Sequence, residues 1–117
     1  MVIYNGNWKN GIQEGQGEEK FPNGTSYKGE FRNNQRHGKG IMKMEDGFSY
    51  SGDWVSGEMS GKGIAVYANG DQYDGYFLNG KREGKGVMTF QDGKVTDTIW
   101  KAGKEVQKDK SKTTPGN

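Results

Sequence analysis

Residues that could carry out chemistry are few in this sequence, and their spacing does not suit catalysis. Side-chain catalysis needs a nucleophile beside a base, or paired acids in a pocket. The chain has no cysteine and a single histidine, His37, at a position that recurs elsewhere as Glu14, Ser60 and Glu83. Such variation is typical of a solvated loop. We therefore expect a protein that is not an enzyme, with no catalytic residue, metal or cofactor.

One segment imitates a phosphate-binding loop. The stretch "GYFLNGKR", from Gly75 to Arg82, has the glycine and lysine spacing of such a loop. Arg82 stands where serine or threonine would have to reach magnesium, and no helix is expected to follow. The similarity is therefore a by-product of a glycine pattern that runs through the whole chain.

The basic residues permit two interpretations. Three lysines recur in Gly-Lys-Gly segments, which would space them about 9 to 10 Å apart on alternate strands of a sheet. One interpretation is a surface for anionic phospholipid headgroups. The candidate lipid-binding residues are Lys39, Lys62, Lys81, Arg82 and Lys85. The other interpretation is cross-strand ion pairing, with Lys39 opposite Glu30 and Lys62 opposite Asp53.

The composition favours a thin, ordered protein without a thick core. Of 117 residues, 29% are apolar and 21 are glycine, and the mean hydropathy is −1.09. The aromatic content of 12% nevertheless argues against disorder. With 17 basic and 15 acidic residues, the net charge of +2 gives no support for nucleic-acid binding. The sequence shows neither a membrane-spanning apolar run nor a signal peptide, so we expect a cytoplasmic protein.

An internal repeat supplies the elements that would position any functional residue. Units of the form Tyr-x-Gly-x-aromatic begin at Tyr4, Tyr27, Tyr50 and Tyr73, with a constant step of 23 residues. A partial fifth unit begins at Thr96. We expect a solenoid-like array over residues 1–104, followed by a polar, flexible tail over residues 105–117. The first part of the segment after Gly103 could add a strand or a short helix over the end of the sheet, and flexibility is expected above all in about the last ten residues.

These units resemble the MORN (membrane occupation and recognition nexus) repeat, in which Tyr-x-Gly-x-Trp-x-x-Gly is followed by Gly-x-Gly and Asn/Asp-Gly. The matching segments are "YNGNWKNGIQEGQGEEKFPNG", "YKGEFRNNQRHGKGIMKMEDG", "YSGDWVSGEMSGKGIAVYANG" and "YDGYFLNGKREGKGVMTFQDG". Asn34 replaces a glycine in the second unit. The partial unit "TDTIWKAG" lacks the Tyr and the Gly, and we expect it to be a closing strand.

The resemblance implies an elongated, twisted, single-layer sheet with an aromatic-lined groove. It also implies a scaffold or adaptor, in a family that is often dimeric and associated with membranes or the cytoskeleton. Such arrays precede lipid kinase and methyltransferase domains as well, so a regulatory repeat domain of a larger enzyme is a further alternative.

The residues themselves predict the same fold class, an all-β antiparallel meander of about eight or nine strands built from hairpins. A three-residue loop, Pro22-Asn23-Gly24, would set Phe21 opposite Thr25 with glycine in the left-handed position. The other connection would be about six residues long and would set Phe31 opposite Gly38. Glycines then form a row across the sheet, and each Trp or Phe ring can lie flat over bare backbone.

The aromatic face is the candidate binding site. Stacking of its rings stabilises the sheet, and the same rings can recognise a ligand; both interpretations remain open. The candidate groove residues are Tyr27, Phe31, Tyr50, Trp54, Tyr73, Phe77, Met42, Met44, Tyr67 and Met88. The expected partner is another protein, bound through a peptide or helix segment. A homodimer and an anionic membrane surface are the alternative partners, and nucleic acid is not expected.

Overall fold

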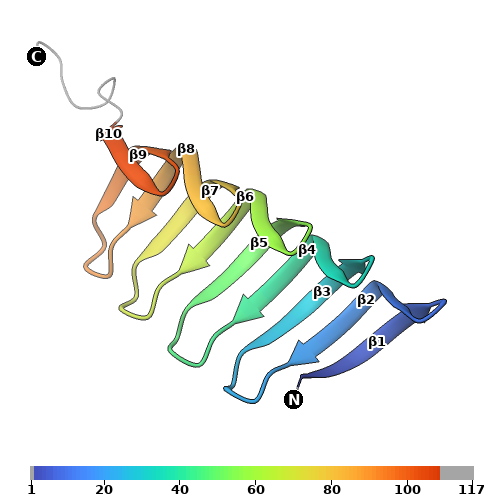
Figure 1. Cartoon of the computed structure of the whole chain (residues 1–117). Helices are drawn as coiled ribbons and strands as arrows, with labels where there is room; N and C mark the ends of the chain where they lie inside the picture. The colour runs from blue at the N-terminus through green and yellow to red at the C-terminus, as the bar shows by residue number, and fades with distance from the viewer. Residues whose placement is uncertain (1, 109–117) are drawn as a thin grey trace, which may run out of the picture.

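The computed structural model describes residues 2–108, which form one open antiparallel sheet of ten strands in chain order (Figure 1). The strands are β1 (Ile3–Lys9), β2 (Ile12–Lys20), β3 (Ser26–Arg32), β4 (Gln35–Lys43), β5 (Ser49–Val55), β6 (Glu58–Val66), β7 (Gln72–Leu78), β8 (Lys81–Thr89), β9 (Val95–Lys101) and β10 (Lys104–Lys108). No helix occurs in the described range, and no second layer covers the sheet. The molecule measures 61 × 24 × 17 Å along its principal axes. The predicted all-β, elongated single-layer meander is confirmed.

The sheet is longer at its C-terminal end than the eight or nine strands expected. The partial fifth unit forms β9, but β9 does not close the sheet, because β10 pairs with it through Lys104 and Lys101. Strand β10 therefore lies mostly in the segment predicted to be a tail. The remainder of that segment, residues 109–117, lies outside the described residues.

The longer connection within each repeat has the predicted geometry. Lys20 pairs with Ser26, and the Phe21 amide donates a hydrogen bond to the Thr25 carbonyl at 2.9 Å. Gly24 adopts a φ of 94°, the left-handed conformation that only glycine adopts without strain. This three-residue loop fixes the parity of the strands, so that Tyr27 and Phe21 lie on one face of the sheet.

The shorter connection differs from the prediction. Phe31 pairs with Arg36, not with Gly38, and Arg32 pairs with Gln35. Asn33 and Asn34 have φ values of 50° and 66°, as in the two-residue type I′ turn that suits the twist of a hairpin. The surplus residues of β4 form a bulge at Gly38, where φ is 72°.

The predicted glycine row is confirmed, but the rings above it are not the predicted ones. Gly29 pairs with Gly40, and Gly40 pairs with Gly52 across the next strand boundary. A Cβ atom on Gly40 would collide with the phenol ring of Tyr27. The tyrosines therefore lie over the glycine row. The expectation that each Trp or Phe has glycine on both neighbouring strands holds on one side only, where Trp54 pairs with Gly38 and Phe31 with Gly15. The bulge causes this difference because it places Arg36 beside Phe31 where a glycine was expected.

The core is a chain of aromatic rings on one face of the sheet. The tyrosine that begins each repeat packs edge-to-face against the ring four residues on and against the corresponding ring of the next repeat. Tyr50, for example, lies 5.3 Å from Trp54 and 5.0 Å from Phe77 between ring centroids, with interplanar angles of 88° and 84°. Tyr27, Tyr50 and Tyr73 are fully buried. This aromatic ladder takes the place of a second layer.

Candidate binding groove

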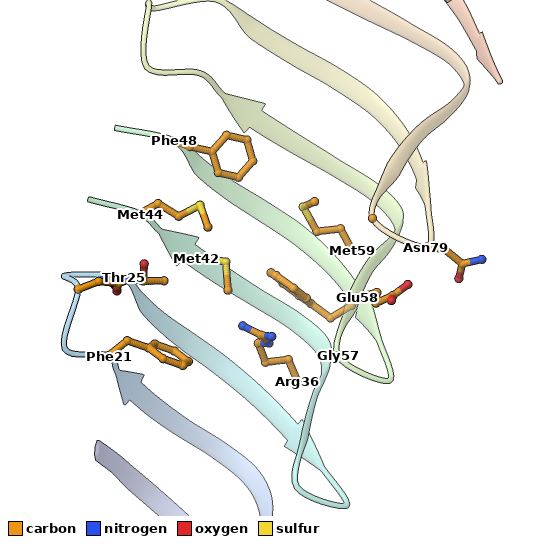
Figure 2. A pocket seen from close by; sticks show the side chains of 13 residues that line it. Phe21, Thr25, Arg36, Met42, Met44, Phe48, Gly57, Glu58, Met59 and Asn79 are labelled. Carbon is orange, nitrogen blue, oxygen red and sulfur yellow. The ribbon is translucent and has the colours of Figure 1, made fainter. Parts of the chain in front are cut away.

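A groove of about 490 Å³ lies on the aromatic face, over the second and third repeats (Figure 2). Its wall side chains are mostly apolar, and a few polar groups stand at its rim. The lining residues are Phe21, Asn23, Thr25, Arg36, Met42, Met44, Phe48, Trp54, Gly57, Glu58, Met59, Asn79 and Gly80. An open groove with apolar walls and few polar groups is the usual form of a site for a peptide or a small molecule.

Two structural features place the lining residues. Strand alternation on β4 brings Met42 to the same face as Tyr27, its partner across the β3–β4 pair. Arg36 lies on the same face as Met42, and the bulge at Gly38 shifts the register so that Arg36 pairs with Phe31. The Gly57 amide donates a hydrogen bond to the Arg36 carbonyl at 2.9 Å, which ties the tips of neighbouring hairpins together.

Most of the predicted groove aromatics are buried in the aromatic face of the sheet, and of these rings only Trp54 lines the groove. Phe31, Trp54 and Phe77 are 3–5% exposed, and Met88 is 7% exposed. The buried tyrosines donate their hydroxyl protons to backbone carbonyls, as Tyr27 does to Glu30 at 2.8 Å. These rings have little surface left for a partner. Their direct contribution is to hold the groove in one shape.

The predicted residues with accessible side chains are Met42, Met44 and Tyr67. Met42 and Met44 line the groove with Trp54, and Met44 is 42% exposed. Tyr67 instead lines a smaller neighbouring hollow of about 250 Å³, where its ring contacts Phe48 at 5.6 Å between centroids. The structure therefore places part of the predicted set in one groove and the rest outside it.

The groove also contains residues that sequence reasoning missed. Arg36 and Met59 occupy the same position in successive repeats, and both were assigned to a loop because Phe31 was expected to face Gly38. Phe48 was missed at the end of the long turn. The available signal was the Asn33-Asn34 pair, which favours a two-residue hairpin and would have moved Arg36 into the sheet.

Arg36 and Glu58 are the charged residues that line the groove, and Arg36 lies against its aromatic rings. Its guanidinium carbon lies 5.2 Å from the Trp54 ring centroid and 5.7 Å from that of Tyr27, within the range of a cation–π contact. Burial raises the pKa of the Glu19 carboxyl on the same face, and the positive charge of Arg36 opposes that shift. Burial also raises the pKa of Tyr27 above its usual value and that of Tyr50 to about 12, so both phenols are neutral at pH 7.

The basic residues predicted to bind lipid do not form one cluster. Arg82 lies on the aromatic face, with its guanidinium carbon 3.8 Å from the Trp100 ring centroid. Lys85 lines a hollow on the opposite face together with Lys62 and Asp74. Lys39 and Lys62 border a second hollow on that face, which has a volume of about 770 Å³ and a floor of glycines.

The predicted ion pairs are present in a different form. Glu30 accepts a hydrogen bond from the backbone amide of Lys39 at 3.0 Å and not from the Lys39 ammonium. Asp53 likewise accepts one from the backbone amide of Lys62 at 3.2 Å and not from the Lys62 ammonium. The Lys39 ammonium pairs instead with Asp53 on the next strand. This hydrogen bond is the main cause that lowers the pKa of the Asp53 carboxyl.

Two further properties of residues 2–108 bear on the site. No group of three or more His, Asp or Glu side chains is placed to hold a metal ion in this range. The same residues contain no helix with the length and hydropathy needed to cross a membrane.

The comparisons with known proteins agree with the repeat. A family model described as MORN repeat matches four consecutive segments, residues 4–26, 27–48, 50–72 and 73–95. A search of curated protein sequences finds no match. The four matched segments span the sheet from β1 to the start of β9 and together make up well over half of the chain. The chain belongs to the MORN repeat family.

Proposed function

We propose that this protein is a non-catalytic interaction module that binds an amphipathic helix of a partner protein in the groove over the second and third repeats. The observation that carries the proposal is the combination of a rigid floor with adaptable walls. Trp54 is 3% exposed and donates its indole N–H to the Gly40 carbonyl at 3.1 Å, so its position is fixed. Met42, Met44 and Met59 form the walls, and methionine adapts to irregular apolar surfaces.

The helical form of the bound segment follows from where the groove lies. It lies over the middle of the sheet, where each strand is hydrogen-bonded to both of its neighbours. A bound segment therefore meets side chains and no free strand edge, so it has to satisfy its own backbone polar groups. An amphipathic helix does so and presents an apolar stripe, which is the helix-in-groove mode of recognition.

An anionic membrane surface is the second candidate, and a different observation supports it. Lys28, Lys39 and Lys62 border the large hollow on the face opposite the aromatic ladder, beside the exposed side chains of Ile41 and Ile64. The ion pair of Lys39 with Asp53 weakens this case. A cytoplasmic location, a homodimer and a regulatory role within a larger enzyme are compatible with either surface, and we offer them as secondary proposals.

The test uses two matched variants, one in strand β4 and one at the residue that directly follows it. Met44→Glu places a charge in the groove, and Ile41→Glu places the same charge on the opposite face; both side chains are exposed, at 42% and 45%. The probe is a phage-displayed library of amphipathic helices with apolar residues fixed at i, i+3, i+4 and i+7. We expect helices selected on the wild type to lose binding to Met44→Glu and to keep it with Ile41→Glu.

Equal binding to both variants would exclude the groove as the site. Sedimentation with vesicles that contain anionic phospholipid, at about 0.15 M salt, tests the second candidate. Binding that the Lys39→Gln/Lys62→Gln double variant abolishes would favour the membrane surface over the groove.

A further inference from the structure

Arg36 is the unusual residue of the groove. It is half-buried and lies near the side chains of Met42 and Met59 (Figure 2), with its guanidinium over the Trp54 ring. The other charged residue that lines the groove is Glu58, which makes no salt bridge with it. Within residues 2–108, no carboxylate lies within salt-bridge distance of its guanidinium. Its contacts are the faces of two aromatic rings, Trp54 and Tyr27. These ring faces attract the positive charge, but they do not accept the hydrogen bonds that the five N–H groups of the guanidinium can donate in its plane.

The same position in other repeats shows that the charge is not needed for the fold. Met59 occupies it in the third repeat and Gln13 in the first. In the fourth repeat, Arg82 lies against Trp100 at 3.8 Å and has the Tyr67 and Tyr73 rings within 5.9 Å. Arg82 is thus surrounded by rings, whereas Arg36 stacks less closely and lines the open groove.

Glu19 compensates the charge of Arg36 only in part. It lies on the same face, opposite Tyr27 in the β2–β3 pair, and the attraction of Arg36 lowers its pKa. Burial raises the pKa of the same carboxyl and is the larger cause. A carboxylate delivered by a ligand would meet the guanidinium in the groove, where apolar walls exclude water and strengthen the pair.

We propose that the helix bound in the groove carries an acidic residue at the edge of its apolar stripe, and that the carboxylate of this residue pairs with Arg36. The inference rests on the proposed function and specifies the chemistry of the partner. Met42, Met59 and Trp54 contact the apolar stripe, and Arg36 sets the register and direction in which the helix lies. A helix with lysine at the same place is excluded by like charge.

The experiment repeats the helix selection on three proteins: the wild type, Arg36→Met and Arg82→Met. Arg36→Met copies the residue that the next repeat has at this position, so the variant should fold. Arg82→Met is the matched control, because Arg82 lies against Trp100, outside the groove. We expect Asp or Glu to be enriched at one position beside the stripe with the wild type and with Arg82→Met, and the enrichment to disappear with Arg36→Met.

One selected helix is then synthesised with Glu and with Gln at the enriched position. We expect the Glu peptide to bind the wild type about tenfold more tightly than the Gln peptide, and the two to bind Arg36→Met equally. If Arg36→Met does not fold, Arg36→Lys serves in its place, because it keeps the charge but not the fork of donors; the preference for Glu should then fall severalfold.

The outcomes separate this inference from the proposed function. Helices that bind through the groove without any acidic preference, or with a preference that Arg36→Met leaves unchanged, overturn the pairing with Arg36 and leave the groove proposal standing. If no selected helix depends on the groove, as judged with Met44→Glu, both proposals fail.

Discussion

The Tyr50 ring lies directly over Gly63 on the neighbouring strand, and its hydroxyl donates a hydrogen bond to the Asp53 carbonyl at 2.9 Å. Gly63 also pairs with Gly52, so that two bare backbone segments lie beneath one ring. The same arrangement recurs with Tyr27 over Gly40 and Tyr73 over Gly86. Glycine, which weakens an ordinary strand, here provides the space in which each tyrosine is buried.

Gly63→Ala should therefore destabilise the protein although alanine is the better strand former. The added Cβ would collide with the Tyr50 ring, and the fully buried ring has no free space into which it could move. Overpacking of this kind costs about 1–3 kcal/mol. Urea unfolding followed by tryptophan fluorescence measures the loss. Ser51→Ala, an exposed substitution on the neighbouring strand, is the control, and equal stability of the two variants would contradict this account of the glycine row.

Alkaline pH should unfold the protein cooperatively above pH 10. Burial raises the pKa of Tyr27, Tyr50 and Tyr73, so the folded state holds their protons more tightly than the unfolded state does. The contribution to stability is complete below the unfolded value near 10 and is lost as the pH rises from there towards the folded value, about 12 for Tyr50. Absorbance at the tyrosinate band and circular dichroism should change together.

Tyr76 provides the internal control for this titration. Its ring is 52% exposed on the opposite face. Tyr76→Phe should leave the cooperative transition in place, because this ring is not part of the buried aromatic ladder. Ionisation of all the tyrosines near pH 10 without loss of the sheet signal would show that the rings are not buried in solution as they are in the structure.

The sequence predicted one half of each repeat better than the other. Parity alone placed Glu19 opposite Tyr27 and Gly17 opposite Gly29, because the three-residue turn at Gly24 leaves one register that keeps the aromatics together. The register at the opposite end of the hairpin was predicted wrongly, because its surplus residues were assigned to the loop. In the structure these residues form a bulge. The free energy of the bulge depends on the left-handed conformation of Gly38 and on the contacts that Glu30 makes with it.

The same error explains why part of the lining of the binding groove was not predicted. A pattern of glycines and aromatics shows which rings share a face, but not whether a neighbouring side chain covers them. Arg36 reaches the face of Trp54 only because the bulge rotates the end of β4 into register with Phe31. Burial of the tyrosines likewise depends on contacts between repeats, which one 23-residue unit does not contain.

Ser56→Asn should stabilise the short turn between β5 and β6. Ser56 has a φ of 47° and is followed by Gly57, whereas the corresponding turns at Asn10 and Asn79 have Asn-Gly. Asparagine tolerates the left-handed conformation better than serine, and Asn-Gly is the preferred type I′ pair. We expect a gain of about 0.5–1 kcal/mol in the free energy of unfolding, measured by urea denaturation.

The control for the turn substitution is Ser56→Val, a β-branched residue for which a positive φ is strained. It should destabilise the protein, although it raises strand propensity. A stabilised Ser56→Val would mean that the turn in solution is not the two-residue turn of the structure.

Acid should remove the contribution of Asp53 to stability. The Lys39 ammonium and the Lys62 amide both bind this carboxylate, and they hold its pKa below the ordinary value of 3.8. Its contribution is therefore fully present above the unfolded pKa and is lost as the pH falls through the lower folded value. At pH 7, Asp53→Asn should cost about 0.2–1 kcal/mol, since Lys39 is largely exposed. Once the pH has fallen below the folded value, the wild type and the variant should converge in urea midpoint. Glu45→Gln, which removes an exposed carboxylate in a turn, is the control for the loss of one negative charge at the surface. A constant difference between wild type and Asp53→Asn across the whole pH range would exclude the ion pair as its source.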